Sequence, residues 1–139
     1  MEIRPFQETD RAGVIGLWEL CDLLRPWNDP DRDIDRKLSV ADDMFLVGTR
    51  SGRVIASVMA GFDGHRGWIN YLGVHPEHQR RRVGGLMMTA AEERLAALGC
   101  PKVNLQIRHS NHCAVAFYEA LGYRTDEVIS MGKRLIADQ

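Results

Sequence analysis

The chain has 139 residues, 45% of them hydrophobic and 27% charged, and its 18 Lys and Arg residues nearly balance 19 Asp and Glu residues, giving a formal net charge of -1. This balance argues against a protein whose main task is to coat nucleic acid, and no stretch approaches the roughly 18 apolar residues that span a bilayer. Three cysteines without CxxC or Cys/His spacing indicate neither a zinc site nor a disulfide framework, so we expect one cytoplasmic domain over residues 1–139, with no metal and no membrane or nucleic-acid partner.

The N-terminal part of the chain predicts one strand and two helices. Residues 2–5 form the strand. Thr9 or Asp10 can cap the first helix, in which apolar residues recur every three or four positions up to Cys21. The segment RPWNDPD then breaks the pattern with two prolines, and the second helix is expected over about 31–40.

The middle of the chain predicts three strands and a long helix. The runs 44–49 and 53–62 are rich in Val, Ile and Phe and are separated by RSG, a turn signal, so they predict a hairpin. WINYLGV at 68–74 predicts the next strand. A helix starts near Gly84 and ends at Gly99, which sits where a left-handed cap belongs. One face of this helix is expected to carry Val83, Leu86, Met87, Ala90, Ala91 and Leu98.

The C-terminal part predicts a strand at 103–108, a helix at 111–122, and two short strands in 123–136 around a turn near Ser130. The element order is then β α α β β β α β α β β. A strand, helix and strand from Trp68 to Arg108 imply a parallel crossover, while the hairpins imply antiparallel pairing. We therefore predict an α/β fold with a mixed, mostly antiparallel sheet and a central parallel β-α-β crossover.

The residues HQRRRVGG at 78–85 lie in the predicted loop between a strand and a helix. A helix N-terminus offers unpaired N–H groups to a phosphate, glycine allows close approach, and arginines add charge-assisted contacts. A solvated basic loop that caps a structural helix explains the same residues equally well. Neither GxGxxG nor GxxxxGK[ST] occurs, so a Rossmann or P-loop site is not indicated.

Two longer segments, VHPEHQRRRVGGLMM and NLQIRHSNHCAVAFYEALGY, resemble the GNAT superfamily of N-acetyltransferases. The family's Q/R-x-x-G-x-G/A loop is matched from Gln79 to Gly84, and its Asn-led helix is matched by Asn111 and by YEALGY at 118–123. The resemblance implies a GNAT-like fold and an enzyme that moves an acetyl group from acetyl-coenzyme A to an amine by direct attack in a ternary complex. The acceptor is a small molecule or a protein. The resemblance leaves the oligomeric state open, with a homodimer as one of the alternatives.

The resemblance also implies which residues hold the cofactor. Tyr118 would protonate the departing thiolate as the catalytic acid, and Asn111 would both cap its helix and contact the cofactor. Arg82 stands where the family has its first glycine. An arginine can hold an ordinary negative φ there, which would leave the Gly84 half of the loop intact. The implied cofactor-binding residues are Leu72, Gly73, Val74, Gln79, Arg80, Arg81, Arg82, Val83, Gly84, Gly85, Asn111 and Tyr118.

No general base is assigned by the sequence. Gln106 and Trp68 occupy the two places where family members carry a glutamate, and neither side chain can accept a proton. The remaining candidates are a water chain or one of Asp63, His75, Glu77 and His109. Without a familiar base, a non-catalytic acyl-coenzyme A-binding sensor or interaction module is the alternative function, and a nucleic-acid module rests on QRRR alone.

The segment RPWNDP at 25–30 has two interpretations. It is either a rigid turn between helices, with Trp27 packed on the core, or a wall of the acceptor site. In the second case Arg25 and Trp27 would select an acidic or planar group.

Overall fold

The computed structural model describes residues 1–79 and 82–138, which form two compact units. The first unit contains Met1–Leu105 together with Asp138, and the second contains Gln106–Ala137. No helix in the described part of the chain is long and apolar enough to cross a bilayer.

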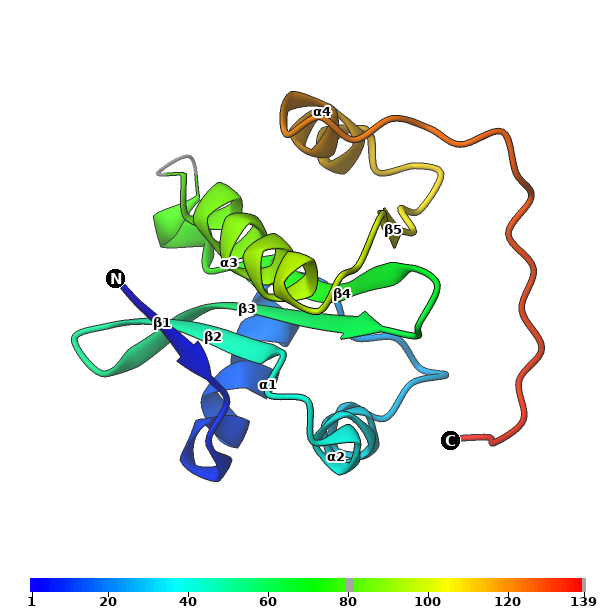
Figure 1. The fold of residues 1–139 in the computed structure, drawn as a ribbon. Helices are drawn as coiled ribbons and strands as arrows, with labels where there is room; N and C mark the ends of the chain where they lie inside the picture. Colours follow the sequence, from blue (N-terminus) through cyan, green and yellow to red (C-terminus); the bar gives the residue numbers. More distant parts are fainter. Residues whose placement is uncertain (80–81, 139) are drawn as a thin grey trace. The chain divides into compact units, whose positions relative to one another are not determined.

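The first unit is built on one five-stranded sheet in the order β1-β2-β3-β4-β5 (Figure 1). Its strands are β1 Glu2–Pro5, β2 Phe45–Arg50, β3 Arg53–Phe62, β4 Gly67–Val74 and β5 Val103–Leu105. The first four strands pair antiparallel, whereas β4 and β5 pair parallel around the crossover helix α3. This confirms the predicted mixed α/β fold with its central parallel crossover.

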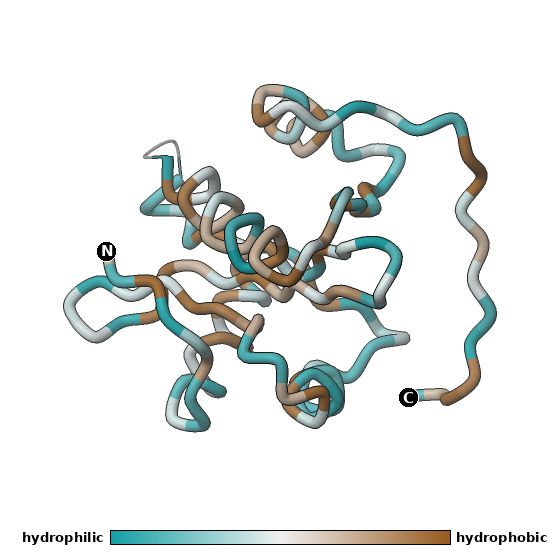
Figure 2. The backbone as a smooth tube through the Cα atoms, viewed as in Figure 1, coloured by the Kyte–Doolittle hydropathy of each residue, from teal (hydrophilic) through white to brown (hydrophobic). Residues whose placement is uncertain are grey.

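Helices cover both faces of this sheet. Helix α3, Val83–Ala97, lies on one face, and α1, Arg11–Leu20, and α2, Pro30–Val40, lie on the other (Figure 1). The strands carry long hydrophobic stretches (Figure 2), as expected for a sheet with both faces covered. On the α1 and α2 face, the buried core consists of Phe6, Val14, Trp18, Ile34, Phe45, Val47 and Met59.

The helix ends follow local chemistry that the sequence largely predicts. Asp29 caps α2, because its side chain accepts a hydrogen bond from the Arg32 N–H at 3.2 Å, and Pro30 fills the first turn. Gly99 follows α3 with a φ of 83°, in the left-handed region expected for a glycine cap. Leu86 in α3 and Leu98, just after the helix, are about half exposed, so they do not share the buried face of Val83, Met87, Ala90 and Ala91. Met88 and Leu95 are buried instead, because α3 is apolar on more than one side.

The second unit is smaller and contains α4, His112–Ala120. Asn111 caps this helix by accepting a hydrogen bond from the Ala114 N–H at 3.1 Å, and Gly122 follows it with a φ of 95°. The two strands predicted in 123–136 are wrong, because the described residues of this unit form no strand, and β5 ends at Leu105 rather than Arg108. A strand requires a hydrogen-bonded neighbour, and the side chains of Ile129 and Met131 are about nine-tenths exposed.

Asp10 precedes α1, but its side chain stabilises the preceding turn instead of capping the helix. The carboxylate accepts hydrogen bonds from the Gln7 N–H at 2.8 Å and from two Arg4 nitrogens at 2.7 and 2.9 Å. Asp10 is buried, and its hydrogen bonds from Arg4 hold the carboxyl pKa below its ordinary value of 3.8. The pair therefore ties β1 to the start of α1.

Replacing Asp10 with Asn should lower the free energy of unfolding at pH 7 by about 1 to 3 kcal/mol, because a charged hydrogen-bond partner of Arg4 is lost. A lowered folded-state pKa contributes stability that is present above the ordinary pKa and is lost as the pH falls through the lowered one. The difference between wild type and variant should therefore shrink below about pH 4. Denaturant unfolding at several pH values measures it, with Glu2→Gln, at the exposed partner of Arg4, as the control. A difference independent of pH would contradict this assignment.

Candidate functional site

The loop between β4 and α3 begins with a short turn that organises its own polar groups. Residues Pro76–His78 form one turn of 3-10 helix, and Nδ1 of His75 accepts a hydrogen bond from the Glu77 N–H at 3.1 Å. The turn thus uses the His75 side chain and the backbone N–H of Glu77. Arg80 and Arg81, two of the residues predicted to bind the cofactor, lie outside the described residues.

The first turn of α3 presents backbone donors to the loop. The helix begins at Val83, and its first helical bond runs from the Leu86 N–H to the Arg82 carbonyl at 3.0 Å. The N–H groups of Val83, Gly84 and Gly85 therefore have no acceptor within the helix. Arg82 cannot cap them, because a guanidinium carries only donors. These donors and the positive end of the helix dipole suit an anion, and the glycines leave space for it.

Arg82 itself adopts an unusual backbone conformation. Its φ is 62° and its ψ is 12°, in the left-handed region, so the expected negative φ is wrong. The chain must turn sharply from the loop into α3 at this residue, which occupies the position of the glycine in the motif. A side chain in this conformation costs roughly 1–2 kcal/mol.

Replacing Arg82 with Gly should raise the free energy of unfolding by about 1 kcal/mol. Relief of the left-handed strain exceeds the roughly 0.5–1 kcal/mol of extra chain entropy that glycine adds to the unfolded state. Denaturant unfolding without ligand measures the change. Arg124→Gly, at an exposed arginine whose φ is not positive, serves as the control and should lower stability slightly. An equal loss in both variants would show that Arg82 is not strained.

The second half of β4 offers an open strand edge. The pairing of β4 with β5 ends at Ile69 and Leu105, so β5 supplies no partner to residues 70–74. Leu72, Gly73 and Val74 lie on this stretch. Gln79 from the loop folds back to it, since its side-chain N–H donates to the Val74 carbonyl at 3.1 Å. The structure thus brings together the predicted strand residues and the first residue of the predicted loop motif.

Gly73 packs closely against the end of α1. A Cβ atom at this position would lie 3.1 Å from Leu23 and 3.4 Å from the Cys21 sulfur. The same thiol donates a hydrogen bond to the Val74 carbonyl at 3.2 Å. The strand end is therefore held from the α1 side by direct contact.

A bulge interrupts β4 just before this stretch. The register of β3 and β4 shifts between Ser57 and Met59, and Tyr71 in the bulge has a φ of 54°. The Tyr71 hydroxyl donates to Oδ2 of Asp33 at 2.5 Å. Burial and the hydrogen bond to Asp33 raise the pKa of Tyr71. No sequence pattern marks these two residues, because nothing distinguishes Tyr71 from an ordinary strand residue or Asp33 from a solvated helix residue.

Tyr118 and Asn111 belong to the second unit, whereas the strand and loop residues belong to the first. Tyr118 lies on α4 among other aromatic side chains, with ring centroids 5.0 Å from Phe117 and 5.6 Å from Tyr123. Burial raises the pKa of Tyr118 to about 12. Its phenol therefore stays protonated at neutral pH, as a proton donor must.

The segment between α1 and α2 gives a mixed result. Arg25 is used locally, because Nη1 donates to the carbonyls of Asp22 and Leu24, each at 2.8 Å. Trp27 is 41% exposed, so the interpretation in which it packs in the core is wrong.

Among the candidate bases, Asp63 has a carboxylate that is hydrogen-bonded within its own turn. Its carboxylate accepts hydrogen bonds from the N–H groups of Arg66 and His65, and from the Trp68 indole at 3.2 Å. The two backbone bonds lower the pKa of Asp63, which makes it a weaker proton acceptor. His109 and Gln106 are exposed residues of the second unit, where the Gln106 side chain donates to the Ser130 hydroxyl.

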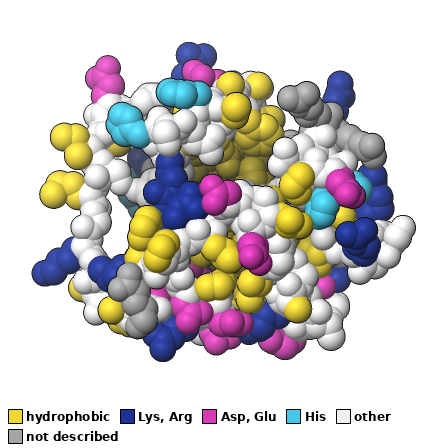
Figure 3. Space-filling model, turned by 180° about the vertical axis from the view of Figure 1, so that it is seen from behind, with side chains coloured by type: hydrophobic (Ala, Val, Ile, Leu, Met, Phe, Trp, Pro, Cys, Tyr) yellow, Lys and Arg dark blue, Asp and Glu magenta, His cyan; other side chains and the backbone are white. Residues whose placement is uncertain are grey.

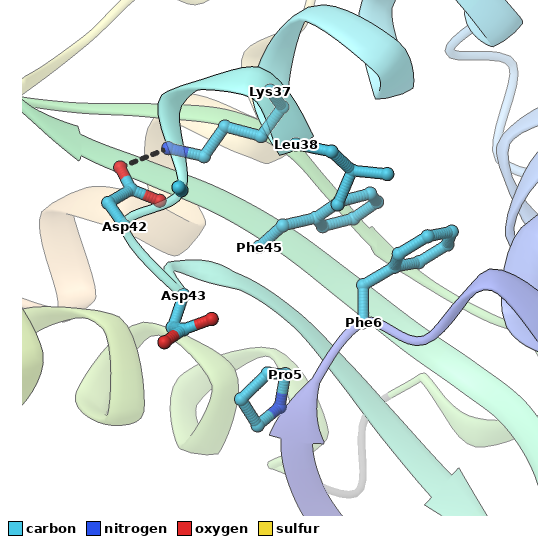
Figure 4. A pocket seen from close by; sticks show the side chains of 8 residues that line it. Pro5, Phe6, Lys37, Leu38, Asp42, Asp43 and Phe45 are labelled. Carbon is cyan, nitrogen blue, oxygen red and sulfur yellow. Dashed lines mark hydrogen bonds and ion pairs between the residues drawn. The ribbon is translucent and has the colours of Figure 1, made fainter.

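A small pocket lies near the C-terminal end of α2, away from the loop that precedes α3 (Figure 4). Phe6 and Phe45 form part of its wall and stack with ring centroids 4.6 Å apart. Lys37 is satisfied there by Asp42 at 2.7 Å and by the Ala60 carbonyl at 2.5 Å. Lys37 and Asp42 are thus paired with each other, and the pocket lies at the α2–β2 connection. On the face of the molecule shown in Figure 3, basic and acidic side chains are interspersed.

Comparisons with known proteins agree on one family. A model of the acetyltransferase (GNAT) family matches residues 14–123. An acetyltransferase of Yersinia enterocolitica is 51% identical over 139 residues, a match that covers 100% of this chain and 99% of that protein.

Solved structures of the same fold were also found. The aminoglycoside N-acetyltransferase AAC(6')-Iy, in complex with the bisubstrate analogue CoA-S-monomethyl-acetylneamine, has a TM-score of 0.75 at 18% identity, covering 96% of this chain and 97% of that one. The ribosomal-protein-S18-alanine N-acetyltransferase from Escherichia coli has a TM-score of 0.68 at 21% identity, covering 87% and 76%. At these identities the two structures show a shared fold.

Proposed function

This chain belongs to the acetyltransferase (GNAT) family and is an acyl-transfer enzyme, and on that premise we propose that it moves an acetyl group from acetyl-coenzyme A to an amine. The amine attacks the thioester directly, with both substrates bound at once. The observation that carries this proposal is the uncapped first turn of α3 beside the open edge of β4.

The proposed cofactor site uses these two features for different parts of one molecule. The N–H groups of Val83, Gly84 and Gly85 and the dipole of α3 would bind the pyrophosphate. The backbone of residues 72–74 would bind the pantetheine arm, which has amide groups that can pair with a strand edge as a peptide does. Gln79 and Arg82 flank the phosphate end, and Arg80 and Arg81 are proposed to assist there.

Tyr118 is proposed as the general acid that protonates the coenzyme A thiolate, and Asn111 is proposed to hold the cofactor near it. The phenol carries its proton at neutral pH, as this role requires. A thiol has an ordinary pKa of about 8.5, so the thiolate can take a proton from an acid placed beside it.

Several broader features of this enzyme are part of the same proposal. Both units would form one acetyltransferase domain, since the family model spans residues of each. The chain is placed in the subgroup of the small bacterial acetyltransferase YpeA, a placement supported by the likeness of LWELCDLLRPWNDPDRDIDRK, YLGVHPE and MGKRLI.

Three free thiols support the cytoplasm as its compartment. Arg25 and Trp27 are proposed to border the acceptor, and a homodimer is the proposed assembly to test by light scattering.

An amine screen tests the proposed function. Thiol release from acetyl-coenzyme A is measured with tetra-alanine amide, Nα-acetyl-lysine amide, spermidine and an aminoglycoside, and acetyl-coenzyme A binding is measured by calorimetry. Turnover with at least one amine is expected. Tight binding without turnover by any amine would identify a cofactor-binding sensor instead, and absence of binding would remove the cofactor site.

A further inference from the structure

Tyr71 has a backbone conformation that is rare for a bulky aromatic residue. Its φ of 54° lies in the left-handed region, where a large side chain is a genuine outlier. Such strain costs about 1–3 kcal/mol and persists only where surrounding contacts determine it. Tyr71 directly precedes Leu72, the first residue of the strand edge proposed to bind the pantetheine arm.

Contacts on three sides hold Tyr71 in this conformation. Its ring stacks on Trp18, with centroids 3.8 Å apart at an angle of 14°. Its carbonyl accepts a hydrogen bond from the Ser57 hydroxyl at 2.8 Å, and that hydroxyl in turn accepts one from the Trp18 indole at 2.9 Å. Trp18 and Ser57 are fully buried, so the ring has one fixed position.

The phenol is the third point of attachment. It donates to Oδ2 of Asp33 at 2.5 Å, and the Asp33 side chain is 22% exposed. Because the hydroxyl proton is directed at Asp33, the lone pairs of the Tyr71 oxygen remain to accept a hydrogen bond from another N–H group. Tyr71 is only partly buried, so part of this side chain faces solvent.

Charged groups around the pair come from several elements. On α2, Nη1 of Arg36 lies 3.4 Å from Oδ1 of Asp33. Asp29, at the start of α2, and Asp138 are close enough to raise the pKa of Tyr71, after burial and the contact with Asp33. Arg36 also binds Asp138, at 2.7 Å. Just after α1 lies the Cys21 thiol, whose pKa is raised by burial.

Resting on the proposed function, we infer that Tyr71 is the catalytic residue that accepts the proton of the acceptor amine, and that Asp33 positions Tyr71 and takes up the proton from its phenol. This assignment fills the role that the sequence leaves without a residue.

The proton transfer accompanies the acyl transfer in one balanced sequence. The amine nitrogen forms a bond to the acetyl carbon, and its N–H proton passes to the Tyr71 oxygen as the hydroxyl proton of Tyr71 passes to Oδ2 of Asp33. The carbon–sulfur bond breaks, its electron pair leaves on sulfur, and Tyr118 protonates the thiolate. Tyr71 remains a neutral phenol throughout. After the transfer Asp33 releases its proton to solvent through Tyr71, and Tyr118 takes one proton from solvent, so both groups return to their starting states.

The test compares Tyr71→Phe, Asp33→Asn and Asp33→Glu with wild type, using tetra-alanine amide and spermidine as the probe amines. Tyr71→Phe keeps the ring on Trp18, and calorimetry with acetyl-coenzyme A confirms that each variant retains its cofactor site. At pH 7, kcat/KM of Tyr71→Phe and Asp33→Asn should fall roughly 10²-fold, the usual loss for a general base. Asp33→Glu should recover part of the activity because it keeps a carboxylate.

The pH profile separates a proton relay from a structural role. Variants without the relay depend on hydroxide, so their kcat/KM should keep rising between pH 7 and pH 10 while that of wild type levels off, and the loss should shrink with pH. A purely structural defect would give the same loss at every pH. Asp35→Asn is the matched control on α2. Asp35 forms an ion pair with Arg11 at 2.6 Å, whereas the Tyr71 hydroxyl donates to Asp33.

The outcomes distinguish this inference from the proposed function. Turnover by wild type with unchanged activity in Tyr71→Phe, or with a loss that does not vary with pH, would overturn the inference and leave the function standing. If wild type turns over neither these probes nor any amine of the screen, the function and the inference fail together. A loss of activity in Asp35→Asn as large as in Asp33→Asn would also overturn the inference.

Discussion

Tyr118→Phe is expected to lower kcat by roughly 10²-fold while leaving acetyl-coenzyme A affinity nearly unchanged. The phenol is proposed to protonate the sulfur as the carbon–sulfur bond breaks, so its loss affects the transition state more than the bound ground state. The aromatic ring stays among Phe117 and Tyr123, so α4 should keep its structure. Because a thiolate is a better leaving group than an amine, the reduction lies at the low end of the range for general acids.

Turnover by thiol release and binding by calorimetry are measured on the same Tyr118→Phe protein. Tyr123→Phe is the matched control, since Tyr123 is a neighbouring aromatic residue with no proposed role in the chemistry. Wild-type turnover in Tyr118→Phe would remove the acid role and leave Tyr118 as a packing residue. A weaker affinity with unchanged kcat would instead place the phenol in cofactor binding.

Gly84→Val is expected to weaken acetyl-coenzyme A binding by at least tenfold, or about 1.4 kcal/mol. Gly84 lies in the first turn of α3 in a helical conformation. Its contribution to the proposed site is therefore the absence of a side chain and not a left-handed φ. A branched side chain there would hold the pyrophosphate away from the N–H groups that bind it. The helix itself should not be weakened, because valine is no worse than glycine within a helix.

Calorimetry with acetyl-coenzyme A measures this effect, and unfolding experiments establish that the variant is folded. Gly16→Val is the matched control, since Gly16 is also helical and a side chain there would meet open space. Its affinity for the cofactor should equal that of wild type. An unchanged affinity in folded Gly84→Val would exclude this turn from the cofactor site.

The sequence alone determined the order of elements as far as α4, because each boundary has a local cause. Pro30 and Asp29 start α2, Gly99 ends α3, and Asn111 caps α4, and all of these signals act within four residues of the chain. Local propensity could not predict the C-terminal strands correctly, because strand pairing depends on a partner that is distant in sequence.

The loop and the helix start of the candidate site were also visible in the sequence, because they form one continuous motif. The conformation of Arg82 was not, since a motif shows which residue stands in place of glycine but not whether the turn still requires a left-handed φ. Whether Trp27 is buried or exposed depends on packing between distant segments, so only the structure decided it.

Tyr71 and Asp33 mark the limit of what the sequence determined about this protein. They are separated by 38 positions, and the Trp18–Ser57 hydrogen bond beside them spans 39. Nothing local to either residue predicts the contact, because it exists only when α1 and α2 pack on the sheet and a bulge rotates Tyr71 out of the regular alternation of β4. The sequence thus determined the family, the elements as far as α4 and the loop proposed to bind phosphate through local patterns. The tertiary structure alone decided which carboxylate meets which phenol, because that depends on packing between distant segments.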